Sequence, residues 1–271
     1  MLSRSYGMAD REKGIRNHEG SAFSLSSAGK PFHAVAMLQL AQQRRVQLTD
    51  PVGRYLTGFT RDIAEQVTIH HMLAGNSGMN TPAEDYVQEN IFRRCGMTGT
   101  AFSTRPQWLT DRHIAHPYMM LAGGSRVDAV RNLDKSSPYL AGKNPGRAFI
   151  DAPGDGGFAT APDLVRFAHA PGDGTVLNRP WADLLTAAKL PHGPASFGSY
   201  TIPVRIVNGQ WMFARADGNP GVGASWSIYP YTGWVGVILS NSDGVPLKEM
   251  SQQEMRAVTG GSPGGGPGGG G

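Results

Sequence analysis

Residues 23–42 read FSLSSAGKPFHAVAMLQLAQ, and within them the chain changes from a strand-like pattern to a helical one. Ser26 or Ser27 can cap the free N–H groups of a helix that starts here, and Pro31 is tolerated in its first turn. The residues that follow are largely apolar: Phe32, Val35, Leu38 and Leu40. A helix that is apolar nearly all round is a buried one, so this stretch predicts a helix inside the fold.

The same stretch raises a chemical question, because Ser27 and Lys30 lie three residues apart and therefore on one face of the expected helix. A serine hydroxyl becomes a nucleophile when a neighbouring base takes its proton, and a lysine amine shielded from water can be that base. Backbone N–H groups at a helix start can also help to hold an oxyanion. The spacing alone still favours a serine cap beside an exposed lysine, because four-residue matches arise often by chance.

The last third of the chain has the period of strands. The runs SYTIPVRIV, QWMFARAD, GASWSIYP and WVGVILSN are separated by Asn208-Gly209, by GNPG and by YTG, which are typical of hairpins and turns. Residues 245–258 then place apolar side chains on one helical face. The Gly/Pro-rich residues 259–271 cannot bury a core and are expected to be a flexible tail.

The middle of the chain reads mainly as helix. Asp50 can cap a helix with Pro51 at its first position, and Thr160 can cap another. Residues 68–74 and 81–96 also have helical patterns, whereas residues 101–155 are irregular. These patterns together predict an α+β fold in which helices flank an antiparallel sheet. One domain would span residues 1–258, with its sheet from about 1–26 and 199–258 and a helical lobe from about 45–190.

The composition excludes several classes of function. The net charge is +4, but the basic residues are scattered, and runs such as QRR at 43–45 are too short for a nucleic-acid surface. Cys95 is the only cysteine, so neither an intrachain disulfide nor a cysteine metal cluster can form. His113 and His116 are three residues apart without a third ligand, so we interpret them as polar loop residues and expect no metal.

The sequence contains no recognisable targeting signal. Residues 1–14 lack the apolar core of a signal peptide, and no segment approaches the length of a membrane span. We therefore expect a soluble protein, and the sequence leaves its compartment open.

Five segments of the chain, taken in order, carry a resemblance to a known family. They include the SSAGK of residues 26–30, the NSGM of 76–79, the YVQENIFRRCGM of 86–97, the GGFATAPDLVRFAHA of 156–170 and the GNPGVGASW of 218–226. Together they resemble the successive signatures of the serine β-lactamase-like family, which includes class C β-lactamases, penicillin-binding DD-peptidases and related esterases. The resemblance covers most of residues 5–250.

The resemblance implies a β-lactamase/transpeptidase-like fold, with a helical domain inserted into a domain built from both chain ends. Its active site would lie in the groove between them. Ser27 would be the acylated nucleophile and Lys30 the group that shuttles its proton. Ser27 is preferred to Ser26 because only Ser27 stands three residues before Lys30.

The chain departs from the family pattern at three places. Family members carry a Tyr-x-Asn or Tyr-x-Ser element in the helical lobe, but here only the NTPAED of residues 80–85 joins the flanking segments. Gly75 replaces the histidine usual in the L-x-H-x-SG stretch. A Lys-Thr-Gly or His-x-Gly element normally precedes the GNPG turn, and the matching residues here are Arg215, Ala216 and Asp217. The helical lobe is therefore expected to be shortened and the third element altered.

The third element supplies the expected substrate-binding residues, which are Arg215, Asp217 and Gly218. Arg215 keeps a cation that could hold a substrate carboxylate. Asp217 stands where a glycine would let the backbone approach the substrate, and its carboxylate would repel an anionic ligand. Backbone N–H groups near Ser27 and around residues 217–219 are the expected oxyanion hole.

The resemblance implies a serine hydrolase that cleaves an ester or amide through an acyl-serine. The expected substrate is a small ester, amide or β-lactam-like molecule, with an ester preferred because Lys-Thr-Gly is absent. No cofactor and no nucleic-acid partner are implied, and the oligomeric state stays open. Family relatives are often periplasmic or secreted. The alternative is a catalytically inactive relative that binds a ligand or a partner, which the missing tyrosine and Asp217 favour.

Overall fold

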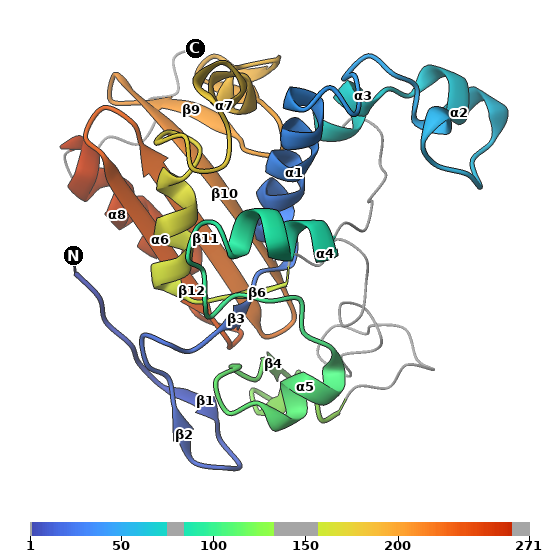
Figure 1. Ribbon diagram of the computed structural model, residues 1–271. Coiled ribbons are helices and arrows are strands. Elements are labelled where there is room, and N and C mark those ends of the chain that lie inside the picture. The colour runs from blue at the N-terminus through green and yellow to red at the C-terminus, as the bar shows by residue number, and fades with distance from the viewer. Residues whose placement is uncertain (1, 75–83, 133–156, 262–271) are drawn as a thin grey trace.

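The structure is a computed structural model that describes residues 2–74, 84–132 and 157–261 (Figure 1). The expected α+β architecture is confirmed. A large antiparallel sheet carries helices on both faces, and a smaller lobe of short strands lies at one end of it. None of the helices in the described ranges combines the length and the hydropathy that a membrane span requires.

The main sheet has six antiparallel strands in the order β12-β11-β10-β9-β8-β7. They are β7 (Leu190–Gly193), β8 (Ser196–Gly198), β9 (Val204–Val207), β10 (Gln210–Asn219), β11 (Val222–Tyr229) and β12 (Trp234–Ser240). Asn208 and Gly209 both have positive φ, 47° and 76°, as a two-residue turn between β9 and β10 requires. The strands expected in the last third are confirmed, but the sheet starts earlier than residue 199, because β7 and β8 fill the interval between it and the end of the expected helical lobe near residue 190.

The two faces of the sheet differ because successive side chains of a strand point to opposite faces. On one face, the Ser227 hydroxyl of β11 donates to Glu254 of α8 (Leu247–Thr259) at 2.7 Å. On the other face, Ala224 and Trp226 of the same strand are at most 1% exposed and belong to the main hydrophobic core. The helices α1 (Lys30–Gln42), α6 (Ala161–His169) and α7 (Arg179–Thr186) cover this second face (Figure 1).

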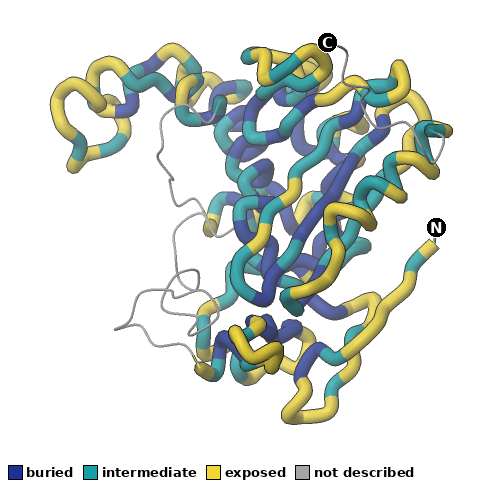
Figure 2. The backbone as a smooth tube through the Cα atoms, turned by 180° about the vertical axis from the view of Figure 1, so that it is seen from behind, coloured by how far each residue is buried: buried dark blue, intermediate teal, exposed yellow. Residues whose placement is uncertain are grey.

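The helix expected from the opening stretch is α1, and a short 3-10 turn, η1 (Ser26–Gly29), leads into it. No residue of α1 is classed as exposed, which confirms the prediction of a buried helix (Figure 2). Phe32 lies edge to face against Phe92 and Phe167, with ring centroids 4.9 and 4.6 Å apart. These rings join α1 to the α6 layer and to the segment after α4.

Two of the expected helix starts are confirmed by their caps. The Thr160 hydroxyl accepts the Asp163 N–H at 3.3 Å and opens α6. The Thr68 hydroxyl accepts the His71 N–H at 3.3 Å and opens α3 (Ile69–Leu73). Each threonine satisfies an N–H group that the helix itself leaves free.

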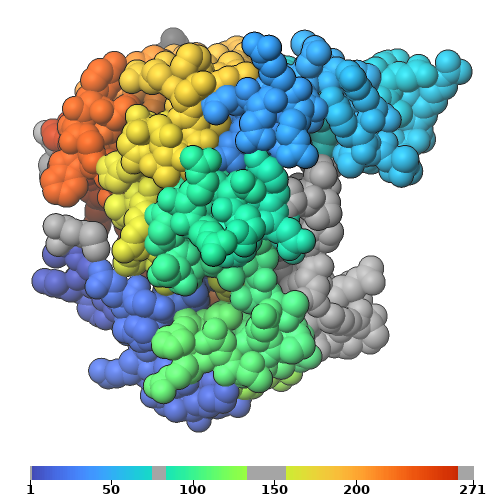
Figure 3. Space-filling view, in the orientation of Figure 1, coloured from blue at the N-terminus to red at the C-terminus, as the bar shows by residue number. Residues whose placement is uncertain are grey.

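Two other expected helices are shorter than the sequence indicates. Pro51 opens only the 3-10 turn η2 (Val52–Arg54), because the Asp50 carboxylate accepts the Gln47 N–H at 2.9 Å and the Tyr55 hydroxyl and so ties a loop. The helix α2 (Arg61–Gln66) follows, and this region protrudes from the body of the molecule (Figure 3).

The helix expected up to Gly96 is also interrupted. Residues 84–87 form α4 (Glu84–Val87), which passes into a π-helical turn, η3 (Gln88–Phe92). Regular helix therefore ends before Gly96, whose φ of 66° reverses the chain.

The first 26 residues do not join the main sheet, which corrects the expected domain layout. Among the described strands, β1 (Met8–Asp10) pairs with β2 (Ile15–Arg16) alone, and β3 (Phe23–Ser24) pairs with β6 (Phe158–Ala159). The Asp10 carboxylate accepts the N–H groups of Glu12 and Lys13 at 3.1 and 3.2 Å. This turn reverses the chain into a hairpin before β1 can run along the sheet. The helix α5 (Arg105–Thr110), β4 (Tyr118–Met120) and β5 (Arg126–Asp128) complete the small lobe.

Candidate active site

Ser27 lies in η1, at the start of the buried helix. Ser26 before it is 5% exposed and has a left-handed backbone with φ of 50°, an uncommon conformation for a residue other than glycine. Ser27 itself is half-buried. Of the two neighbouring serines, Ser27 is therefore the one whose side chain is more accessible to a ligand.

Two side chains of the main sheet hold η1 in place. The Nε atom of Arg215 donates to the Ser27 carbonyl at 3.1 Å, and the indole Nε1 of Trp226 donates to the Ala28 carbonyl at 3.0 Å. Arg215 on β10 and Trp226 on β11 are directly opposite each other in the sheet. Carbonyls at the start of a turn need partners, and here a cross-strand pair supplies them.

Lys30 is the first residue of α1, and its backbone N–H donates to the Ser27 carbonyl. Lys30 is half-buried, and among the described residues no hydrogen bond joins its amine to the Ser27 hydroxyl. The structure thus puts the two residues on consecutive turns without a direct bond between their reactive atoms.

His33, one turn after Lys30, is a neighbour that the sequence interpretation missed. Burial lowers the pKa of its imidazole below the usual 6.5, and the positive charge of Lys30 lowers it further. The signal for this neighbour was its i, i+3 spacing from Lys30. At neutral pH, His33 therefore stays uncharged beside the Lys30 amine.

Asp217 and Gly218 lie near the end of β10, where the strand leaves β9. The Ala214 N–H donates to the Pro203 carbonyl on the β9 side of β10. Because backbone N–H groups alternate between the two edges of a strand, the Gly218 N–H faces this same side. Among the described strands, β9 pairs with β10 only as far as Phe213, so no strand covers the Gly218 N–H.

The Gly218 N–H is nevertheless engaged, because it donates to Oδ1 of Asp217 at 2.7 Å. A side chain at position 218 is excluded, since a Cβ atom would lie 2.5 Å from the Val222 carbonyl oxygen. The backbone donor expected to belong to the oxyanion hole is thus present, and the carboxylate that replaces the family glycine occupies it.

Arg215 makes backbone contacts that the sequence did not indicate. Its Nη1 donates to the Thr201 carbonyl at 3.1 Å, in addition to the Nε bond to Ser27, so two of its three nitrogens bind backbone. Nη2 lies 4.0 Å from Oδ2 of Asp217. Burial lowers the pKa of Arg215, and the charge of Asp217 opposes that shift. These contacts hold the guanidinium against η1, and the expected role of Arg215 in binding a substrate carboxylate stays a prediction.

Gly75 lies outside the described residues, as do most of the residues that join the NSGM segment to α4. The other expected site residues are described, and the structure brings four of them together. Ser27, Arg215 and Asp217 meet around one guanidinium, and Gly218 binds the Asp217 carboxylate.

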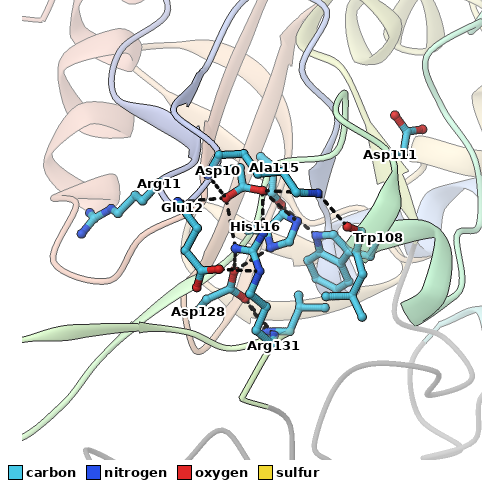
Figure 4. Close-up of polar contacts among 12 residues, drawn as sticks. Asp10, Arg11, Glu12, Trp108, Asp111, Ala115, His116, Asp128 and Arg131 are labelled. Atoms are coloured by element: carbon cyan, nitrogen blue, oxygen red, sulfur yellow. Dashed lines mark hydrogen bonds and ion pairs between the residues drawn. The ribbon is translucent and has the colours of Figure 1, made fainter.

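A second polar cluster, in the small lobe, was missed by the sequence interpretation. His116 is not a loop residue exposed to water: it is 2% exposed, and its Nδ1 lies 2.6 Å from Oδ2 of Asp128 (Figure 4). Arg131 binds Asp10 through Nη1 and Nη2 at 3.0 and 2.7 Å and Asp128 through Nη1 at 2.6 Å. The sequence signal was the i, i+3 pair Asp128 and Arg131 in an irregular segment. Within the described ranges, no group of three or more His, Cys, Asp or Glu side chains has a metal-binding arrangement.

Hydrogen bonds beside this cluster join the small lobe to the end of the main sheet. Asn241, just after β12, donates from Nδ2 to the Met8 carbonyl at 2.9 Å and to the His116 carbonyl at 2.8 Å. The Asp243 carboxylate accepts the Gly221 N–H in the turn between β10 and β11 through one oxygen and the Met120 N–H of β4, in the small lobe, through the other, each at 2.7 Å. The lobe therefore supports the turn that follows Asp217 and Gly218.

Solved structures share this fold. A penicillin-binding protein from Bacillus halodurans superimposes with a TM-score of 0.78 over 93% of this chain and 91% of its own, at 18% identity. A D-amino acid amidase from Ochrobactrum anthropi has a TM-score of 0.68 over 93% of this chain and 88% of its own, at 17% identity. A class C β-lactamase from Rhodobacter sphaeroides has a TM-score of 0.70 at 12% identity, covering 93% and 89% of the two chains.

Curated relatives match a shorter part of the chain. The esterase EstB of Burkholderia gladioli is 40% identical over 83 residues, which are 29% of this chain and 21% of the esterase. The teichoic acid D-alanine hydrolase of Staphylococcus aureus is 30% identical over 78 residues, 29% of this chain and 19% of that protein. The matched segment spans about a fifth of the length of each relative.

The β-lactamase family model matches this chain in two overlapping pieces, residues 1–82 and 76–258. The pieces meet where the sequence lacks the Tyr-x-Asn element. Because these matches cover most of the chain, it belongs to the β-lactamase family.

Proposed function

We propose that the protein is a serine hydrolase that cleaves a small ester or amide through an acyl-enzyme at Ser27. The observation that carries this proposal is the placement of Ser27: it is the accessible serine of η1, one turn before Lys30, and Arg215 and Trp226 hold its turn on the sheet. A nucleophile held on a rigid support keeps its attack geometry at little entropic cost.

In the proposed reaction, Ser27 Oγ bonds to the substrate carbonyl carbon while its proton passes to the Lys30 amine. The carbon–oxygen or carbon–nitrogen bond to the leaving group then breaks, and Lys30 returns the proton to that group. Water attacks the acyl carbon in the second half, giving its proton through Lys30 and releasing the acid and free Ser27. The N–H groups of Ser27 and Gly218 are the proposed donors to the oxyanion.

The relatives support this reaction class. Their names include an esterase, a D-alanine hydrolase and a D-amino acid amidase, whose substrates share an acyl carbonyl. An ester is preferred to a β-lactam, because Arg215-Ala216-Asp217 replaces the Lys-Thr-Gly element.

The test is covalent labelling with a fluorophosphonate, read by intact mass, together with p-nitrophenyl acetate hydrolysis. We expect one adduct on Ser27 and turnover that both disappear in Ser27→Ala and persist in Ser26→Ala, the matched control next to it. Lys30→Gln should lower turnover by about 10² or more, the usual range for a general base. A folded protein that shows neither an adduct nor Ser27-dependent hydrolysis contradicts the proposal.

A second candidate, binding without turnover, is favoured by one observation: Asp217 occupies the Gly218 N–H. In that case the same experiment gives no adduct, while acyl ligands still raise the melting temperature of the protein.

A further inference from the structure

The contact between Asp217 and Gly218 has a direct consequence for the proposed reaction. The Gly218 N–H is the proposed strand donor to the oxyanion, and in the described structure Oδ1 of Asp217 accepts it at 2.7 Å. A hydrogen bond to a carboxylate is stronger than one to a neutral ester carbonyl. The carbonyl oxygen of a neutral substrate must therefore displace a stronger acceptor, the Asp217 carboxylate, before the Gly218 N–H can donate to it.

The charges around this contact favour one kind of substrate. The side chain of Asp217 is 35% exposed and that of Arg215 is 21% exposed, so the carboxylate is the outer of the two charges. Arg215 already gives Nε and Nη1 to the carbonyls of Ser27 and Thr201. Its Nη2 is 4.0 Å from Oδ2 of Asp217, longer than a direct hydrogen bond. A ligand at this edge thus meets a carboxylate that is incompletely paired.

We propose that Asp217 is a specificity-determining residue that selects esters or amides of amino acids with a free amino group. The proposal rests on the function proposed for Ser27. The substrate ammonium pairs with Asp217 and draws its carboxylate from the Gly218 N–H, which then donates to the oxygen of the reacting carbonyl. A neutral acyl group has no positive charge to pair with Asp217, and the Asp217 carboxylate repels a negatively charged one.

The ammonium group takes no part in the bond changes. Ser27 Oγ bonds to the carbonyl carbon of the amino acid, the ester or amide bond breaks, and Lys30 carries the proton to the leaving group. The amino group stays protonated on the acyl-enzyme until water releases the free amino acid. Asp217 therefore acts through substrate choice and through the Gly218 N–H, without forming a covalent bond.

Three matched substrates test the proposal: the p-nitrobenzyl esters of alanine, N-acetylalanine and N-succinylalanine, which are positive, neutral and negative beside one carbonyl. For the unaltered protein we expect kcat/KM to be at least about tenfold higher for the alanine ester than for the N-acetyl ester, the size of one charge-assisted hydrogen bond. In Asp217→Gly this ratio should fall towards one, because the N-acetyl ester is cleaved faster once the Gly218 N–H is free. Asp183→Asn, at an exposed carboxylate on α7, is the control and should leave the ratio unchanged.

A ratio near one in the unaltered protein, or a ratio that Asp217→Gly does not change, overturns the proposal. Calorimetry with Ser27→Ala separates it from the proposed function, because this variant binds without turnover. Alaninamide should bind more tightly than N-acetylalaninamide to Ser27→Ala, and the additional Asp217→Gly change should remove the difference. Absence of that difference overturns the selection by Asp217 even where no ester is hydrolysed.

Discussion

The Nε atom of Arg215 donates a hydrogen bond of 3.1 Å to the carbonyl of Ser27, a residue 188 positions earlier in the chain. A side chain of the main sheet thereby holds the backbone of the proposed nucleophile. Trp226, the cross-strand partner of Arg215, does the same for the next carbonyl, that of Ala28. This pair makes the position of Ser27 depend on strands that form in the last third of the chain.

We predict that Arg215→Lys lowers both stability and turnover. A lysine amine cannot bond the carbonyls of both Ser27 and Thr201 as the fixed fork of a guanidinium does. The Ser27 carbonyl still accepts the Lys30 N–H, so the partly buried carbonyl that can lose its partner is that of Thr201. Such a loss costs about 1–3 kcal/mol in the free energy of unfolding. Urea denaturation measures this cost, and the exposed Arg205→Lys on β9 is the control. Unchanged stability in Arg215→Lys would show that the guanidinium does not support η1.

Trp226→Phe should separate the indole hydrogen bond from the packing of the ring. The substitution keeps an aromatic ring against Phe167 but leaves the Ala28 carbonyl without its donor. We expect a loss of about 1–2 kcal/mol in unfolding free energy and a lower rate of fluorophosphonate labelling at Ser27. Trp234→Phe, at a ring that is 59% exposed, should change neither quantity. Equal effects of the two substitutions would contradict the role given to the indole N–H.

The carboxyl group of Asp10 makes the stability of the small lobe depend on pH in the acidic range. Burial opposes ionisation of its carboxyl, but hydrogen bonds from Arg131 and the Lys13 N–H and the nearby charges outweigh burial and lower its pKa from 3.8 to about 2. Because the folded pKa lies below the unfolded one, this carboxylate stabilises the protein above pH 3.8. That stabilisation is lost as the pH falls from 3.8 to about 2. Its size is about 2 kcal/mol.

Melting temperatures between pH 2 and pH 5 measure this effect. Asp10→Asn should flatten the pH dependence in that window, whereas Asp183→Asn, at a carboxylate with 62% exposure, should keep it. Arg131→Met should lower the free energy of unfolding at neutral pH by about 3–5 kcal/mol, because it leaves the buried carboxylates of Asp10 and Asp128 without their cation. A pH profile that Asp10→Asn leaves unaltered would contradict the assignment.

Cys95 should be unreactive in the folded protein. Burial raises the pKa of its thiol from 9.0 to about 11, the charge of Asp173 raises it further, and that of Arg94 lowers it. At pH 8 the thiolate is therefore scarce, and alkylation by iodoacetamide should be slow until the protein unfolds. Intact mass after a timed reaction, with and without urea, measures both rates. Rapid native labelling would show that the thiol is more open than the structure describes, and would make it a rival nucleophile to Ser27.

The sequence by itself determined the elements whose causes are local. The turn at Asn208 and Gly209 needs two residues that accept positive φ, and the caps at Thr68 and Thr160 need a hydroxyl beside free N–H groups. The helix after Ser27 follows from its apolar run. In each case the interacting groups lie within a few residues, so the pattern carries the information. The family also followed from the order of such segments.

Only the tertiary structure decided which distant elements meet. Asp50 and Pro51 have the chemistry of a helix start, yet the Asp50 carbonyl accepts the Ile69 N–H at 3.1 Å and the Val52 N–H donates to the Val67 carbonyl at 2.8 Å. The short strands before residue 26 read as part of the main sheet, yet β1 pairs with β2 and β3 pairs with the distant β6. Local propensity is a weak preference, and packing between distant segments overrides it.

Some features of the candidate site are likewise set by the sequence and others by the tertiary structure. The spacing of Ser27 and Lys30 is a property of the sequence, because one helix turn sets it. The support of Ser27 by Arg215 and the burial of His116 between Asp10 and Asp128 are not properties of the sequence. They depend on strand register and on the docking of two lobes, which bring together residues separated by up to 233 positions, as in the hydrogen bond of Asn241 to Met8. Hydrogen bonds and ion pairs require atoms within a few ångströms, and only the folded chain supplies that proximity.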